Sequence, residues 1–267
     1  MNYADFVPAR LKIVNKEGVT VPFILNPIQT KFLTEDSSDR DIVLKARQQG
    51  FSSLILAMFT ADFLLTENSV NVVVADIADN SEALLARVKF FLKSYEEAVG
   101  MKIPLKYNSK YQLYNEAINS SYSIGTATNT DFGRSRTITN LHLSEVFFYP
   151  DIQSIMAGAL QAVVPTGRVI LETTANGFNF GKDFWERSKV GETGFKPLFY
   201  KASDFYSPEF LEQKRKELGR LYKQEYPETD IEAFLSSGDQ FFDSESLEWY
   251  LNNYRKPHDK PTEFWYA

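Results

Sequence analysis

The segment KARQQGFSS, at residues 45–53, stands between two patterns of different kinds. A short β-prone run at residues 41–44 leads into it, and an apolar pattern with helical spacing continues from Ser52 to about Leu65. A loop between a strand and a helix can hold phosphate, because N–H groups of the loop and of the first helical turn point at a bound anion. The segment is therefore predicted to be a phosphate-binding loop.

The pattern G-x-x-x-x-G-K-[ST] fixes where each group of such a loop should lie. Gly50 matches the second glycine, and Ser52 matches the hydroxyl that coordinates magnesium. Phe51 occupies the lysine position, and Lys45 occupies the position of the first glycine. A lysine at the start of the loop can curl back over the phosphates, and the planar fork of Arg47 also suits phosphate oxygens. The alternative is an ordinary strand–loop–helix connection with basic residues.

A carboxylate closes another β-prone run, ITNLHLSE at residues 138–145. Nucleotide hydrolases place a metal-organising acid at such a strand end, often followed by a glutamate that polarises the attacking water. Ser144 stands at the first position and Glu145 at the second. A serine brings no charge, so magnesium would depend more on Ser52 and the phosphates. The alternative for Glu145 is a surface side chain that caps the next element, and His142 is expected to pack within the strand.

Small polar residues close the next predicted strand, in the run TTANG at residues 173–177. Thr173, Thr174 and Asn176 would lie beside the γ-phosphate, where side chains can sense hydrolysis and couple it to movement. The alternative is a simple turn, because Asn-Gly is a strong turn signal by itself.

A helix start is indicated by the Asn-Pro pair at residues 26–27. Gln29 follows within this helix. Its amide is suited to reading the edge of an adenine ring, and the alternative is an exposed helix glutamine.

Composition excludes several other kinds of site. The chain has no cysteine, which excludes disulfides, thiolate metal sites and cysteine nucleophiles. Its two histidines, His142 and His258, weigh against a histidine-based zinc site or a Ser-His-Asp triad. The net charge of −6 argues against passive coating of nucleic acid, although local groups can still contact DNA. With no signal peptide and no bilayer-spanning apolar stretch, we expect a soluble intracellular protein that uses no membrane.

Strand-like and helical patterns alternate through residues 1–204. A hydrophobic fraction of 43% in 267 residues is enough for a large core. The predicted elements are a hairpin at 11–25, helices at 26–33, 52–65, 80–97 and 180–189, a loop at 34–39, a strand pair at 111–115 and 121–125, and strands at 41–44, 70–74, 137–143, 168–173 and 195–201. This alternation predicts an α/β fold with a mostly parallel central sheet flanked by helices.

The character of the chain changes after residue 204. Residues 208–225 are helical in pattern and heavily charged, and the rest is mixed and polar. We predict an ATPase core over residues 1–204 and a small lid subdomain with a linker over residues 205–267.

Taken together and in this order, these segments resemble the N-terminal ATPase domain of the large terminase subunit of tailed bacteriophages. Each piece is weak alone, but the combination is specific and spans nearly the whole chain. The matching stretches are NPIQTKF at 26–32, KARQQGFSS at 45–53, LHLSEV at 141–146, ETTANG at 172–177 and EYPETDIEAFLSSG at 225–238. The fold that this implies is a P-loop NTPase of the ASCE type, with divergent Walker A and Walker B motifs.

The resemblance also implies roles for individual residues. Glu145 would be the catalytic glutamate, with Lys45 as the displaced Walker A lysine and Arg47 as the loop arginine. The coupling motif would be Thr173, Thr174 and Asn176, and magnesium would be held by Ser52 and Ser144, directly or through water. The implied ATP-binding residues are Gln29, Lys45, Ala46, Arg47, Gln48, Gln49, Gly50, Phe51, Ser52 and Ser53.

The same family implies ATP and Mg²⁺ as cofactors, and a motor that drives double-stranded DNA through the portal of a preformed capsid. Its implied partners are the portal protein, the small terminase subunit and further copies of the chain in a ring, commonly a pentamer. Its expected location is the host cell cytoplasm, transiently docked on the viral procapsid. Full-length members carry a C-terminal nuclease domain with an RNase H-like fold. We expect this chain, which ends at Ala267, to lack that domain and nuclease activity, with Asp239, Asp243 and Glu245 in the linker.

Two groups of basic residues leave their role open. Arg134 and Arg136 precede the acid-bearing strand, where they would contact DNA, act across a subunit boundary or be solvated. The second group is sparse, and a solvated loop is the better expectation for it than a DNA-facing surface. Its members are Lys102, Lys106 and Lys110.

Two other functions remain compatible with the sequence. A helicase-like remodelling ATPase would share the same core, although helicases usually place two such cores in tandem. A non-hydrolysing capsid interaction module is suggested by Phe51 and Ser144, which depart from the motor pattern.

Overall fold

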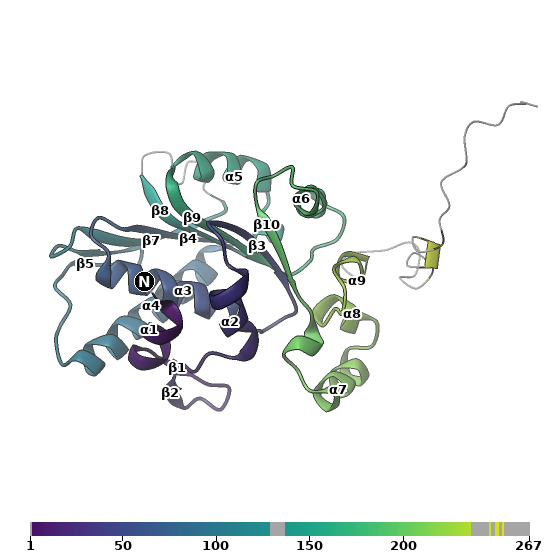
Figure 1. Cartoon of the computed structure of the whole chain (residues 1–267), viewed down its shortest axis with the longest axis horizontal. Helices are drawn as coiled ribbons and strands as arrows, with labels where there is room; N and C mark the ends of the chain where they lie inside the picture. The colour runs from purple at the N-terminus through teal and green to yellow at the C-terminus, as the bar shows by residue number, and fades with distance from the viewer. Residues whose placement is uncertain (1, 129–136, 236–245, 247–248, 251–252, 254–267) are drawn as a thin grey trace, which may run out of the picture.

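The computed structural model describes residues 2–128 and 137–235, together with residues 246, 249, 250 and 253. One large sheet organises these residues, with strand order β10-β3-β9-β8-β4-β7-β6-β5 (Figure 1). Pairing is parallel from β10 to β7 and antiparallel from β7 to β5, which confirms the predicted mostly parallel sheet. The strands are β3 Arg40–Lys45, β4 Val70–Ala75, β5 Leu105–Asn108, β6 Gln112–Asn115, β7 Ser120–Thr126, β8 Ile138–Ser144, β9 Val163–Thr173 and β10 Lys196–Tyr200.

Helices cover both faces of this sheet (Figure 1). One face carries α1 Tyr3–Arg10, α3 Phe51–Leu65 and α4 Ala78–Val99, and the other carries α5 Ile152–Gln161 and α6 Phe180–Lys189. Successive strand residues point to opposite faces, so Val43 joins the core with α3, while Ile42 and Leu44 join the core with α5 and α6. α3 is apolar on all sides and almost wholly buried, as expected for a helix enclosed by its neighbours.

The N-terminal segment contains the predicted hairpin and the predicted short helix. β1 Lys12–Val14 and β2 Thr20–Pro22 pair antiparallel, and α2 Pro27–Lys31 begins at Asn26 with a reciprocal capping box to Gln29. The chain then continues as a π-helical turn, η1 Phe32–Asp36, which differs from the loop predicted at residues 34–39. The fully buried Phe32 ring explains the difference, because it anchors the turn on the core.

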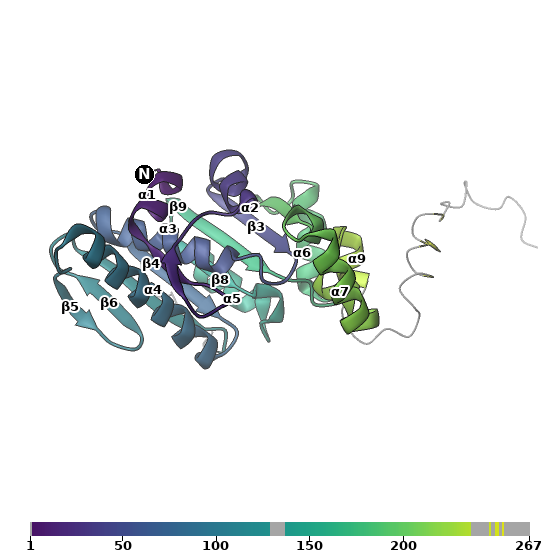
Figure 2. The same cartoon turned by 90° about the horizontal axis from the view of Figure 1, so that it is seen from below.

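The C-terminal helices lie where the chain leaves the carboxyl ends of β3 and β10 (Figures 1 and 2). They are α7 Pro208–Leu218, α8 Tyr222–Glu225 and α9 Asp230–Leu235, with 3-10 turns η3 Ala202–Asp204 and η4 Gly219–Leu221. Their own core is aromatic. The rings of Tyr206 and Phe210 stack with centroids 4.4 Å apart, and Tyr226 packs edge-on against both. Ala46 and Ala202 belong to the same cluster, and the predicted division into a core over residues 1–204 and a lid subdomain with a linker over residues 205–267 stays a prediction.

The structure adds elements that the sequence patterns do not predict. These include α1, α5, α9, the strand β5, the 3-10 turns η2 Val146–Phe148 and η3, and the first half of β9. No helix among the described residues is both long enough and apolar enough to cross a lipid bilayer.

Candidate active site

The loop between β3 and α3 is held on one side by the N-terminal helix α2. Gly50 adopts the left-handed conformation, with φ of +82°, and precedes the first residue of α3. The Gln29 Nε2 atom donates a hydrogen bond to the Gly50 carbonyl at 2.9 Å, and the Asn26 Nδ2 atom donates one to the Gln49 carbonyl at 3.2 Å. The Gln29 amide therefore shapes the loop in this structure, and adenine recognition by Gln29 stays a prediction.

The other side of the loop is held by the C-terminal helices and β10. The buried Gln49 donates through Nε2 to the Lys201 carbonyl at 2.9 Å, and the Tyr206 hydroxyl donates to the Arg47 carbonyl at 2.8 Å. The N–H groups of Ala46 and Arg47 donate to the carbonyls of Tyr200 and Glu225. The loop conformation is thus fixed from both sides by contacts within the chain.

Phe51 does not contribute its side chain to the site. The ring is fully buried and packs against Tyr200 and Phe32, with centroids 4.7 and 5.6 Å away. The position that carries lysine in the standard pattern is therefore a core position here. Any contact of Phe51 with a ligand would come from its backbone N–H at the start of α3.

Lys45, at the end of β3, is the buried cation of the site. Its side chain is 5% exposed, and its Nζ atom lies 2.9 Å from Glu172 Oε1 and 3.3 Å from Glu145 Oε1. Burial lowers the pKa of this ammonium, but the two carboxylates more than offset burial and raise the pKa above its usual value. Lys45 therefore stays charged, as the predicted role requires.

Glu145 lies directly after β8, and its Oε2 atom accepts hydrogen bonds from the Thr174 N–H at 3.1 Å and the Thr174 hydroxyl at 3.4 Å. Its side chain remains 35% exposed. Desolvation of its carboxyl group within the pocket, followed by the attraction of Lys45 and the repulsion of Glu172, leaves the pKa of Glu145 above its usual value although part of the side chain stays exposed. A raised pKa makes this carboxylate a better proton acceptor, which suits a group that orients and deprotonates water.

Glu172, at the end of β9, is a site residue that the sequence motifs did not single out as one. Its carboxylate is completely buried and accepts hydrogen bonds from Ser52 at 3.0 and 3.1 Å and from Ser144 at 3.2 Å. Burial raises its pKa, but Lys45 and His142 outweigh burial and hold the pKa below its usual range. The sequence feature that could have identified Glu172 is an acid inside an apolar strand. A buried carboxylate needs hydrogen-bonding or charged partners, so such an acid points to a polar site.

The predicted coupling residues connect Glu145 to the turn that follows it. Thr174 contacts the Glu145 carboxylate, while the Thr173 hydroxyl accepts from the Phe147 N–H at 3.3 Å. Asn176 donates to the Phe147 carbonyl at 3.0 Å. A displacement of Glu145 would therefore change the contacts of the 173–176 segment directly. The coupling role of this segment stays a prediction.

Arg47 reaches away from Lys45 toward the C-terminal helices. Its guanidinium lies 2.6 Å from Glu225 Oε2, and its side chain is 59% exposed. A pocket of about 260 Å³ opens at this point, beyond the carboxyl ends of β4, β8 and β9, which is where parallel α/β sheets bind ligands. It is lined by Arg47, Asp76, Glu145, Phe148, Thr174, Gln224 and Glu225.

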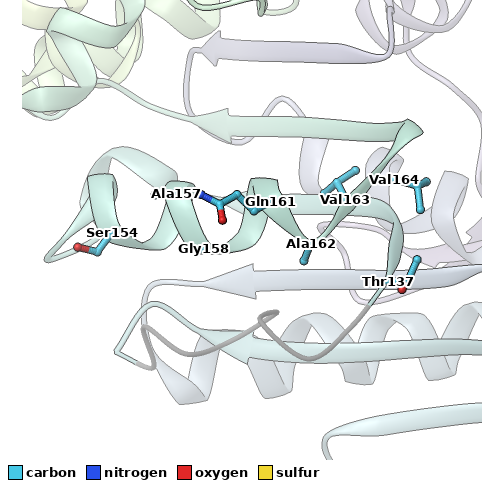
Figure 3. A pocket seen from close by; sticks show the side chains of 8 residues that line it. All are labelled: Thr137, Ser154, Ala157, Gly158, Gln161, Ala162, Val163 and Val164. Atoms are coloured by element: carbon cyan, nitrogen blue, oxygen red, sulfur yellow. The ribbon is translucent and has the colours of Figure 1, made fainter.

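A larger hollow of about 650 Å³ runs along α5 and the start of β9 (Figure 3). Its lining carries no acid, base or cation among the described residues, so it offers no group for hydrolytic chemistry. The lining residues are Thr137, Ser154, Ala157, Gly158, Gln161, Ala162, Val163 and Val164. We assign the site to the smaller pocket, beside Lys45 and Glu145.

The oxygen groups around Glu172 fit a nucleotide-bound magnesium ion better than an independent metal site. Magnesium usually keeps several waters and takes one or two carboxylates together with substrate phosphates. The hydroxyls of Ser52 and Ser144 and the Glu172 carboxylate form such an oxygen-only group. No cluster of three or more metal-ligating His, Cys, Asp or Glu side chains occurs in the described residues.

Several predicted residues lie away from the site or outside the described residues. Lys102, Lys106 and Lys110 each form a surface ion pair, with Glu96, Glu116 and Glu82 respectively, as expected for a solvated stretch. The remaining ones fall outside the residues that the structure describes, so their predicted roles stay predictions. They are Arg134, Arg136, Asp239, Asp243, Glu245 and His258.

Comparison with known proteins finds solved structures that share the fold of this chain. No model of a known protein family matches the sequence. The ATPase domain of the Thermus phage P74-26 large terminase is 16% identical, with a TM-score of 0.59 over 76% of this chain and 92% of that chain. The HK97 bacteriophage large terminase is 13% identical, with a TM-score of 0.65 over 84% of this chain and 52% of that chain.

A large terminase from a thermophilic bacteriophage, solved in complex with ADP, is 14% identical, with a TM-score of 0.55 over 74% of this chain and 51% of that chain. The present chain thus matches about half the length of this protein and of the HK97 protein. The structural similarity to the P74-26 and HK97 proteins extends over 76% and 84% of this chain. The chain therefore has the fold of the ATPase domain of phage large terminases.

Proposed function

We propose that this chain hydrolyses ATP with Mg²⁺ and that hydrolysis drives double-stranded DNA into a viral procapsid. The observation that carries the proposal is the contact of Lys45 and Thr174 with Glu145, across three neighbouring strands at the ligand-binding end of the sheet. The ADP complex of a structure with the same fold adds support for a nucleotide at this end.

Each group has a distinct role in the proposed reaction. Lys45 and the first N–H groups of α3 bind phosphate oxygens, and Arg47 exchanges Glu225 for phosphate when nucleotide enters. Glu145 orients the attacking water and accepts its proton. Mg²⁺, when bound with the nucleotide, neutralises charge on the phosphate oxygens.

The replacement Glu145→Gln tests the catalytic assignment. It keeps the size of the side chain and removes the proton acceptor, so we expect turnover to fall by about 10²–10⁴-fold. Nucleotide affinity should stay within a few-fold, as read by titration with a non-hydrolysable ATP analogue.

Glu116→Gln is the matched control, because Glu116 pairs with Lys106 on the surface far from the loop and should leave turnover unchanged. Equal loss in both variants, or turnover that survives in Glu145→Gln, would overturn the assignment. If the unmodified chain neither binds nor hydrolyses ATP with Mg²⁺ over a wide range of concentrations, the ATPase proposal itself fails.

The translocation part of the proposal has its own partners. We propose that the chain acts in the host cytoplasm as a ring docked on the procapsid, with the portal protein, the small terminase subunit and double-stranded DNA. Turnover that rises when procapsids with portal and linear DNA are added would support it. Stimulation by single-stranded DNA alone would favour a helicase-like remodeller instead.

The non-hydrolysing alternative loses its motivation at residue level. Phe51 was one reason for it, but Phe51 is a core residue and Lys45 places an ammonium beside Glu145. Ser144 was the other reason, because it lacks the charge of an acid. The Glu172 carboxylate on the neighbouring strand accepts a hydrogen bond from Ser144 and places a negative charge beside it.

A further inference from the structure

The end of β8 lacks the acid that usually organises magnesium, because Ser144 occupies that position. The missing charge is found one strand away. β8 and β9 pair in parallel, and Ser144 and Glu172 are direct Cα partners in this ladder. Partnered residues of neighbouring strands project to the same side of the sheet, about 5 Å apart. A carboxylate on β9 can therefore reach the space that a β8 acid would fill.

The contacts of Glu172 place its carboxylate at that point. Its oxygens lie 3.0 and 3.1 Å from the Ser52 hydroxyl, the group that matches the magnesium ligand of the standard loop. The Ser144 hydroxyl is 3.2 Å away, on the other side. The carboxylate thus bridges the predicted metal ligand of α3 and the vacant acid position of β8.

The charge balance of the pocket gives the carboxylate a second reason to face a cation. Glu172 is fully buried, and its main partner is the Lys45 ammonium at 2.9 Å. When Lys45 binds phosphate, its charge is shared with the ligand, and Glu172 is left buried next to a polyanion with His142, 3.4 Å away, as its other nitrogen partner. An uncompensated buried charge is strongly unfavourable, and a divalent cation between carboxylate and phosphate removes that cost.

We propose that Glu172 is the acid that orients the water shell of the nucleotide-bound Mg²⁺ in this chain, in place of the acid absent from β8. The inference rests on the proposed ATPase function. It identifies Glu172 as the carboxylate that organises the metal in that function. Glu172 acts on the metal and its waters, whereas Glu145 acts on the attacking water. The competing role for Glu172 is that of a structural counter-ion for Lys45 alone.

The test compares nucleotide affinity with and without metal, so it needs no turnover. Dissociation constants of a non-hydrolysable ATP analogue are measured by calorimetry in Mg²⁺ and in EDTA. For Glu172→Gln we expect the gain in affinity from Mg²⁺ to shrink by about 10–100-fold. The affinity in EDTA should hold or tighten, because the variant removes a negative charge near the phosphates and frees Lys45.

The double variant Ser144→Asp/Glu172→Gln moves the carboxylate back to β8 and keeps one buried counter-ion near Lys45. It should recover most of the Mg²⁺ gain, and it guards against a Glu172→Gln protein that folds poorly. Equal weakening in Mg²⁺ and in EDTA, with no recovery in the double variant, would show that Glu172 is only a counter-ion. Absence of any nucleotide binding by the unmodified chain would instead overturn the proposed function.

Discussion

Gly50 shows how one residue can join two parts of the site. Its φ of +82° disfavours any side chain, and an added Cβ would lie 2.8 Å from the Gln29 Nε2 atom that holds the loop. Gly191 has nearly the same φ, +81°, with nothing within 4 Å of an added Cβ. The two glycines therefore separate the cost of backbone strain from the cost of the contact.

We expect Gly191→Ala to lower the free energy of unfolding by about 1 kcal/mol, the cost of left-handed backbone for a residue with a side chain. Gly50→Ala should cost about 1 kcal/mol more, because the Gln29 hydrogen bond must also break. Urea denaturation of both variants measures the difference. Equal losses would mean that Gln29 moves aside freely and does not fix the loop.

The sequence predicted which of the main polar residues lie together but not the contacts that each of them makes. Lys45, Glu145 and Thr174 meet because each ends a predicted strand of one parallel sheet. The positions of Phe51 and Glu172 were beyond motif comparison, because both depend on packing between segments distant in sequence. In the proposed site, Lys45 supplies the charge missing at Phe51, and Glu172 supplies the charge missing at Ser144. A linear motif does not display either substitution.

At the scale of elements, strong periodicity gave reliable predictions and conflicting signals did not. α6 matches its predicted range of 180–189 because caps and apolar spacing agree. α1 contains Pro8, which argues against a helix, and the first half of β9 contains Pro165 and Gly167, which argue for a turn. β5 is mostly exposed and lacks the alternation of a half-buried strand. Tertiary pairing overrides these local signals.

Asp230 ties α9 of the C-terminal group to α6 of the sheet layer. It accepts hydrogen bonds from Trp185 Nε1 at 2.8 Å and from Lys189 Nζ at 2.9 Å. Burial raises the pKa of Asp230, but Lys189 and Trp185 outweigh burial and lower it below its usual value. Asp230→Asn should lower the free energy of unfolding by about 1 kcal/mol at neutral pH, since solvent partly screens the pair.

The pH dependence of that loss has a definite sign. A depressed carboxyl pKa stabilises the fold above the unfolded value of about 3.9, and this contribution disappears as pH falls through the lower folded pKa. The free energies of unfolding of the unmodified chain and of Asp230→Asn should therefore show their full difference above about pH 5 and become equal in strong acid. Glu192→Gln breaks an exposed ion pair with Arg187 in the same region, and its free energy of unfolding should be almost the same as that of the unmodified chain. A difference that is independent of pH would rule out the ionic contribution.

For the whole molecule, the strand–helix alternation was sufficient to predict the sheet and its flanking layers. The order of the strands was not predicted, although it decides the site, because β9 lies between β3 and β8 and so places Glu172 between Lys45 and Ser144. The contact of the C-terminal helices with the loop, through Arg47 and Glu225, was equally beyond local patterns. Both depend on how distant segments meet.

The charge of the pocket suggests that one chain does not complete the site. Among the described residues, the lining carries the carboxylates of Asp76, Glu145 and Glu225 against the Arg47 guanidinium, and the Lys45 ammonium behind the lining is shared between Glu145 and Glu172. A surplus of negative charge opposes a bound polyphosphate. A cation from a neighbouring copy would correct the balance, so we expect ATP turnover per chain to rise with protein concentration. A dilution series of steady-state rates measures this, and turnover per chain that is independent of concentration would indicate a self-sufficient site.

Glu145 adopts a left-handed backbone conformation, with φ of +54°, at the point where β8 ends. Glycine or asparagine would occupy this position with less strain, so the local fold and the proposed chemistry favour different residues. At residue 145, stability therefore favours one type of residue and the proposed activity favours another. In a lineage released from the need for this carboxylate, glycine or asparagine at this position should relieve the strain of the left-handed backbone.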